Sequence, residues 1–149
     1  MDTKAKNFIR RKLIPFILRE HGTGFAMGTW VDKLPVGELT QYDGVDRRIP
    51  ICGTAACIGG SACVVGKAKN IDDTTFAKNA LGLTSEQANG LFFEWNVCDN
   101  PNGDCGMHHW PAKFAKAFEA RKTPLGKAKV AAALLEEVVR TNGACLQHL

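Results

Sequence analysis

The stretch ICGTAACIGGSACVVG, residues 51–66, constrains the fold of this chain more than any other segment. It is built largely of cysteine, glycine and alanine, and its bulkier residues, such as Ile58, are mostly apolar. A helix that is apolar on every side is a buried helix. The segment therefore predicts a central buried helix over about 54–66.

Small residues recur along this predicted helix in steps of four, at Ala55, Gly59 and Cys63. Such a stripe lets a neighbouring backbone approach more closely than the usual ~8–10 Å between helix axes. Gly59 and Gly60 each weaken an isolated helix by ~1 kcal/mol relative to alanine, so close packing must recover the loss. We expect Cys57 and Cys63 to be small core side chains, which is the commonest fate of a free cysteine.

The remaining pattern predicts a mainly α fold of about six helices around the central one, in one helical domain over 1–149. An amphipathic helix over 3–20 should kink near Arg11, because Pro15 removes a backbone donor. Residues 25–50 read as irregular chain or short strands. Four further helix boundaries are marked by capping or turn residues: Asp72 or Asp73, Thr84 with Gln87, Thr123 with Pro124, and Asn142 with Gly143.

The composition is that of a globular protein, with 45% hydrophobic and 23% charged residues. No apolar run is long enough to span a bilayer, so no membrane partner is expected. The amino-terminal stretch lacks a signal peptide's apolar region and cleavage site, which predicts a cytoplasmic protein. Its six cysteines are then expected to be reduced thiols.

The net charge of +4 is concentrated in two groups. The first comprises Lys4, Lys6, Arg10, Arg11 and Lys12. The second comprises Lys113, Lys116, Arg121 and Lys122, followed by Lys127 and Lys129. Clusters of this kind are usually solvated faces, but they can attract an acidic protein surface or a phosphate backbone.

Two kinds of chemistry are conceivable for the thiols and histidines. Placed at the start of the predicted helix, Cys52 could be a nucleophile with His108 or His109 as its base. Alternatively, a metal could bind a set drawn from the cysteines and histidines of one polar loop: Cys98, Cys105, His108 and His109. Their spacing is not that of an ordinary zinc site, so neither a metal nor another cofactor is expected.

Four motifs resemble, in order, a family of small uncharacterised bacterial and phage proteins. They are FAMGTW at 25–30, CGTAACIGGSA at 52–62, LGLTSEQANGLF at 81–92, and WP at 110–111. Ser61 departs from the family, which often has a bulky aromatic residue or histidine there. The resemblance implies a phage or mobile-element setting and brings no activity with it.

These observations favour a non-enzymatic binding protein that docks on a host or phage protein through its basic residues. In the phage setting, inhibition of a bacterial defence system is a conceivable role. A Cys52-dependent hydrolase or transferase and nucleic-acid binding through the basic clusters stay open as alternatives. The sequence leaves the oligomeric state open as well.

Overall fold

The computed structural model describes residues 1–92 and 110–146. Helices and short strands occur in the following order: α1 (Thr3–Phe8), α2 (Ile14–Leu18), β1 (Val31–Lys33), β2 (Leu39–Tyr42), β3 (Val45–Arg48), β4 (Thr54–Ala56), α3 (Ile58–Val65), α4 (Thr74–Ala80), α5 (Ser85–Phe92), α6 (Ala112–Ala120) and α7 (Pro124–Arg140).

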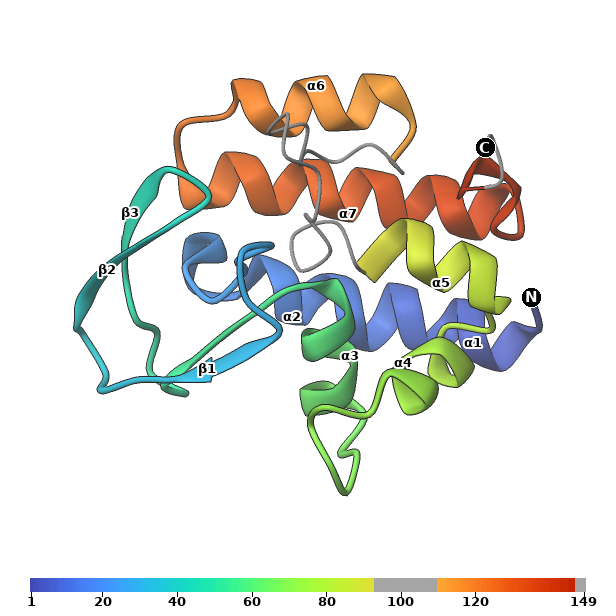
Figure 1. Cartoon of the computed structure of the whole chain (residues 1–149), viewed down its shortest axis with the longest axis horizontal. Helices are drawn as coiled ribbons and strands as arrows, with labels where there is room; N and C mark the ends of the chain where they lie inside the picture. Colours follow the sequence, from blue (N-terminus) through green and yellow to red (C-terminus); the bar gives the residue numbers. More distant parts are fainter. Residues whose placement is uncertain (93–109, 147–149) are drawn as a thin grey trace, which may run out of the picture.

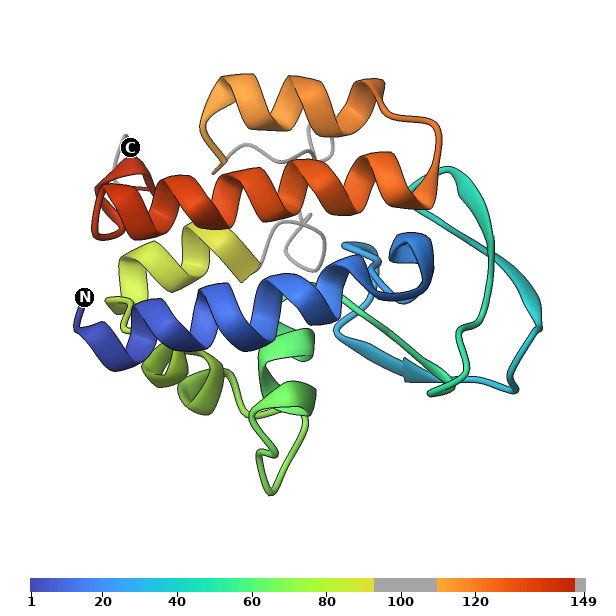
Figure 2. The ribbon, with the colours of Figure 1, turned by 180° about the vertical axis from the view of Figure 1, so that it is seen from behind.

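Helix α7 lies between α6 on one side and the amino-terminal helices α1 and α2 on the other (Figure 1). Seen from behind, α1 and α2 form one long rod beside α7 (Figure 2). The shorter helix α3 crosses this rod and contacts α2, α4 and α5. The core lies where these layers meet, and its largest fully buried side chains include Trp110, Phe25, Phe118, Ile9, Leu13, Ile17, Ile58, Leu134 and Leu135.

The amino-terminal rod accommodates Pro15 through a change of helix type. Residues Ile9–Leu13 form a π-helical turn between α1 and α2, and the Ile14 N–H donates to the Ile9 carbonyl. Single π turns inside α-helices are a recognised way of absorbing such an interruption. The disturbance predicted near Arg11 is thus present, as a π turn within a continuous rod.

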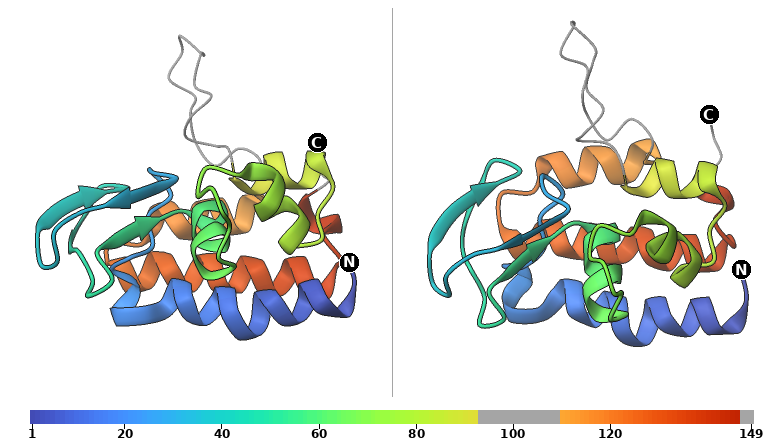
Figure 3. Two further views of the ribbon diagram at one scale, coloured as in Figure 1. Left: turned by 90° about the horizontal axis from the view of Figure 1, so that it is seen from below. Right: turned by 60° about the horizontal axis from the view of Figure 1, so that its bottom comes forward.

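The prediction of a mainly α fold is wrong, because residues 31–56 form β-structure and the fold is a helix-rich mixture of α and β. β1 pairs with β4, and β2 pairs with β3, as two antiparallel two-stranded sheets. The two sheets share the same register, with Val31 opposite Ala56 in one and Tyr42 opposite Val45 in the other, and a turn on each arm lies between them. The two sheets are therefore halves of one long hairpin, here called the ribbon (residues 31–56), which projects from one end of the helical layers (Figure 3).

The turn of the ribbon explains why it forms. Asp43 and Gly44 connect β2 to β3 with φ of 54° and 73°. Two successive positive φ angles are the geometry of a type I′ turn, whose twist matches that of paired strands and which favours Asp-Gly. The dipeptide thus fixes the register of β2 and β3.

The central helix is shorter than predicted. Residues Thr54–Ala56 are strand β4, and α3 begins at Ile58. Cys57 caps α3, with its Sγ accepting a hydrogen bond from the Gly60 N–H at 3.4 Å. Ala55 and Ala56 have a high intrinsic helix propensity, and pairing with β1 overrides it.

The buried character of α3 is confirmed. Its residues from Ile58 to Cys63 are all buried, as is Cys57. A β-carbon on Gly59 would overlap the Trp30 ring and lie 3.1 Å from Phe92. The absence of side chains at this point lets the Trp30 ring lie against the helix backbone, as predicted for a thin helix.

Several predicted helix boundaries are confirmed by their hydrogen bonds. Asp73 caps α4 by accepting from the Phe76 N–H at 2.9 Å. Thr84 and Gln87 form a reciprocal capping box, with distances of 2.9 and 3.2 Å. Thr123 caps α7, and Asn142 and Gly143 end it with positive φ angles.

Candidate partner-binding groove

A groove of about 920 Å³ runs between the amino-terminal rod and α4. Its apolar lining comes from both sides, with Ala5 and Phe8 on the rod and Phe76 and Ala80 on α4. Phe8, Phe76 and Ala80 are only partly buried, so apolar surface remains exposed inside the groove. Exposed apolar surface with a polar rim is typical of an interaction site.

Two glycines allow the walls of the groove to come together. A β-carbon on Gly66, at the end of α3, would lie 2.7 Å from the Phe76 ring. Gly82, with φ of +63°, reverses the chain after α4, and a β-carbon there would lie 2.9 Å from that of Ala5. Both positions hold α4 against its neighbours and set the width of the groove.

The rim of the groove carries more positive than negative charge; its one carboxylate among the described lining residues, Asp2, accepts a hydrogen bond from the Ala5 N–H at 2.8 Å. Lys4, Arg11 and Lys12 line the groove. They share a face of the rod with Phe8, because residues that follow Lys4 by four, seven and eight positions fall on the same side of a helix. Within the described residues, no ion pair joins these three cations to a carboxylate. They are therefore available to an acidic partner.

The other members of the first basic group have different surroundings. Arg10 turns toward α7 and pairs with Glu136 at 3.0 Å. Both side chains are about half exposed, at 51% and 50%, so this pair contributes little to stability. Lys6 is partly buried and does not line the groove.

The second basic group lies on the far side of the molecule. Lys113, Lys116, Arg121 and Lys122 are exposed on α6 and on its connection to α7. Because α7 lies between α6 and the amino-terminal rod, the two basic groups do not form one surface (Figure 1). Lys127 is buried rather than solvated, and its Nζ donates to the Phe118 carbonyl at 2.9 Å.

Cys52 is not at a helix amino terminus, and that prediction is wrong. It is exposed and precedes β4, so the peptide dipoles of α3 do not act on it directly. Its sulfur lies 3.3 Å from a guanidinium nitrogen of Arg19. The predicted partners His108 and His109 lie outside the described residues.

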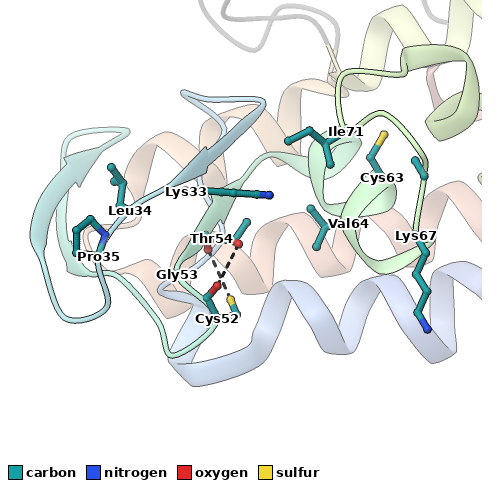
Figure 4. Close-up of a pocket in the computed structure, with 11 residues that line it drawn as sticks. Lys33, Leu34, Pro35, Cys52, Gly53, Thr54, Cys63, Val64, Lys67 and Ile71 are labelled. Atoms are coloured by element: carbon teal, nitrogen blue, oxygen red, sulfur yellow. Dashed lines mark hydrogen bonds between the residues drawn. The ribbon is translucent and has the colours of Figure 1, made fainter.

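Cys52 also lines a second cavity, of about 650 Å³, between the ribbon and α3 (Figure 4). Lys33 extends from β1 across this cavity toward α3, whereas the Lys67 side chain points away from it (Figure 4). Cys63 belongs to the lining but is fully buried, and its thiol donates to the Asp73 carbonyl at 3.2 Å. These side chains do not converge on one point, so they form no evident reaction centre.

Burial keeps the core thiols protonated. It raises the pKa of Cys57 to about 11 and that of Cys63 to about 11. A thiol of that pKa is a poor nucleophile at neutral pH, because the thiolate is the reactive form. Both residues have the core role that the sequence predicts.

The predicted metal ligands Cys98, Cys105, His108 and His109 all lie outside the described residues. Within residues 1–92 and 110–146, no group of three potential ligands could hold a metal ion.

None of the helices in these two ranges combines the length and hydrophobicity that crossing a membrane requires.

Sequence reasoning missed the buried charges that attach the tip of the ribbon to the segment just before it, at Phe25 and Met27. The side chains of Asp43 and Arg47 are 1% and 0% exposed, and they lie 3.9 Å apart. The Met27 N–H donates to Asp43 at 2.9 Å, and Arg47 donates to the carbonyls of Phe25 and Tyr42. The alternation of buried and exposed residues along a strand that begins after Asp-Gly would have placed Arg47 inside.

No protein-family model, curated protein or solved structure matches this chain. The order of motifs that resembles small phage proteins therefore stays a hypothesis. One detail bears on it: the hydroxyl of Ser61 is buried and donates to the Ala56 carbonyl at 3.4 Å. The backbone of this chain thus supplies Ser61 with a partner where the family often has a larger residue.

Proposed function

We propose that this chain is a non-enzymatic binding protein that captures an acidic amphipathic helix of a partner protein in the groove between the rod and α4. The observation that carries the proposal is the combination of Phe8 and Phe76 inside the groove with three cations on its rim. An amphipathic helix docks by laying apolar anchors into such a groove. Carboxylates beside those anchors would then meet Lys4, Arg11 and Lys12.

The resemblance to phage proteins motivates the choice of partner. We propose a bacterial host protein, met in the cytoplasm, whose action is blocked when one of its acidic helices is held in the groove. Inhibition of a defence system would be one instance of this mode of action.

A designed peptide tests the groove even while the natural partner is unidentified. The probe is a fluorescent helical peptide with leucines at positions i, i+4 and i+7 and glutamates between them. Its binding to the full chain is measured by anisotropy at several salt concentrations. We expect a dissociation constant that weakens with salt, since charge attraction is screened, but that retains an apolar component at high salt.

Two triple variants provide the matched comparison. Changing Lys4, Arg11 and Lys12 to glutamate should weaken binding by roughly a hundredfold or more, because attraction becomes repulsion. Changing Lys113, Lys116 and Lys122 to glutamate makes the same change in net charge, but on the far side of the molecule. The dissociation constant of the peptide should then stay within about threefold of the wild-type value. Equal losses in both variants would reduce the effect to net charge and overturn the proposal.

Duplex DNA and single-stranded RNA serve as competing probes. Binding to a nucleic acid with a steep salt dependence, and tighter than to the peptide, would favour the nucleic-acid alternative. In that case the variant Phe8→Ala should have little effect, whereas it should weaken the peptide complex.

A further inference from the structure

The distal half of the ribbon carries an unusual amount of exposed apolar surface. Val36, Leu39 and Ile51 are 60%, 63% and 81% exposed, and they are the large exposed apolar residues of the described chain. Val36 and Ile51 each lie in a turn of one arm, Pro35–Glu38 and Pro50–Gly53, and Leu39 begins β2. This surface is distinct from the groove, which lies between the rod and α4.

Strand β2 forms one edge of the ribbon and has backbone N–H and C=O groups that do not pair with β3. The Ile49 N–H donates to the carbonyl of Glu38, the residue opposite it, so the backbone groups of this pair face each other. In an antiparallel ladder such pairs alternate with pairs that point their backbone groups outward. Leu39 and Gln41 therefore direct their N–H and C=O groups away from β3, and both residues are exposed.

An edge of this kind is a template for another strand. A two-stranded ribbon is marginally stable by itself, and further strands stabilise it. β3 also contacts α7, whereas the main contact of β2 is with β3. A strand that joins the ribbon would therefore add at β2.

Charge indicates what the added strand is. The exposed charged residues of the ribbon are Lys33, Glu38, Asp46 and Arg48, which carry equal numbers of positive and negative charges. A neutral surface of mixed sign with aliphatic side chains does not repel a copy of itself, although the chain as a whole carries +4. The basic rim of the groove, in contrast, would repel another copy.

We propose that two copies of this chain associate through their β2 strands, paired antiparallel across a two-fold axis into one four-stranded sheet. Such an interface is self-complementary. The outward N–H groups of Leu39 and Gln41 in one copy donate to outward C=O groups of β2 in the other copy, and their own C=O groups accept from its N–H groups. Val36 and Leu39, on the arm that carries β2, lose exposed apolar surface beside it. The groove remains open in each copy.

The test uses the full chain in analytical ultracentrifugation and light scattering over a range of concentrations. Wild-type protein should sediment as a dimer that dissociates on dilution. Gln41→Pro removes the outward N–H without removing a hydrogen bond of the ribbon's own ladder, so it should weaken dimerisation by roughly tenfold or more. Gln41→Ala is the matched control, since it loses the same side chain but keeps the N–H, and it should remain dimeric.

A second variant guards against misfolding of Gln41→Pro, which circular dichroism and a thermal melt would reveal. Leu39→Lys places a charge beside its own copy across the two-fold axis and should also yield monomers while leaving the fold intact. A wild-type chain that is monomeric at all concentrations would overturn the proposal. A dimer that survives both folded β2 variants but dissociates in Arg11→Glu would place the interface at the groove instead.

Discussion

The carbonyl oxygen of Trp30 occupies the position that a β-carbon on Gly60 would take. Strand β1 begins at the next residue, and Gly60 lies in the first turn of α3, so this contact fixes the ribbon against the helix. The oxygen belongs to the backbone and cannot turn aside as a flexible side chain would. Only glycine fits at position 60 beside the Trp30 carbonyl, and the packing that this contact allows offsets the low helix propensity of glycine.

Gly60→Ala should lower the free energy of unfolding by about 2 kcal/mol or more. Overpacking in a core costs ~1–3 kcal/mol, and the ~1 kcal/mol gained from helix propensity offsets only part of a clash with backbone. Chemical denaturation monitored by circular dichroism measures the change. Gly126→Ala is the control: a β-carbon there would lie 3.0–3.3 Å from side-chain atoms of Thr123 and Arg121, so these side chains need to shift by only a few tenths of an ångström. A Gly60→Ala variant as stable as wild type would contradict the close contact.

The capping box at the start of α5 should contribute measurably to stability. Thr84→Ala removes the acceptor of the Gln87 N–H and should cost ~1 kcal/mol, as is usual for an N-cap. The control is Thr75→Ala, an exposed threonine inside α4, which should be neutral or slightly stabilising because alanine is the better helix former. Equal effects from the two substitutions would show that the hydrogen bonds of the box are not favourable in solution.

Local signals in the sequence predicted the starts of α4, α5 and α7 well. Capping hydrogen bonds involve residues three positions apart, so Asp73, Thr84 and Thr123 could be recognised from the local sequence, whatever the tertiary contacts. The burial of Cys57 and Cys63 also followed from the sequence, because a helix rich in glycine can be stable only inside a core.

The prediction was wrong where residues distant in sequence decide the conformation. Thr54–Ala56 became a strand because Val31–Lys33 lies beside it, and nothing local to residues 54–56 indicates this. The fold class could have been corrected from Asp43-Gly44, a strong hairpin signal between two residues of high strand propensity, Tyr42 and Val45. The groove brings together the rod and α4, two helices far apart in sequence, so only its rim of lysines and arginines could be recognised from the sequence.

The thiols should react in an order set by burial. Cys52 is exposed, whereas Cys57 and Cys63 are buried. Brief treatment of folded protein with iodoacetamide at mildly alkaline pH, followed by peptide mass spectrometry, should label Cys52 and leave the other two unmodified until the protein is denatured. Rapid labelling of Cys57 in folded protein would contradict the core position of α3.

Alkaline pH should destabilise the protein partly through Cys57. Its pKa is raised from 9.0 in an ordinary thiol to about 11 by burial, so the folded state holds the proton over a range in which the unfolded state releases it. Stability from this group is complete below pH 9.0 and declines as the pH rises toward about 11. Cys57→Ser keeps a capping oxygen and should flatten this decline relative to wild type, whereas Cys52→Ser, at an exposed position, should not. Parallel pH profiles of wild type and Cys57→Ser would contradict the assignment.

The attachment of the ribbon through Asp43 and Arg47 gives a prediction about coupling. Burial raises the pKa of Asp43 and lowers that of Arg47, which shows that each charge loses solvation in the fold. Asp43→Asn leaves Arg47 buried without its counter-charge and should cost about 3–5 kcal/mol, whereas Arg47→Met should cost less, because Lys127 still attracts Asp43.

Together, the two substitutions should cost much less than the sum of their separate effects, because no lone charge then remains. A double-mutant cycle on the free energy of unfolding measures this coupling. Glu38→Gln with Arg48→Met, two exposed residues of the same ribbon, is the matched pair and should be nearly additive. Additive effects at Asp43 and Arg47 would mean that the two charges act separately, and that Arg47 holds the ribbon only through the carbonyls of Phe25 and Tyr42.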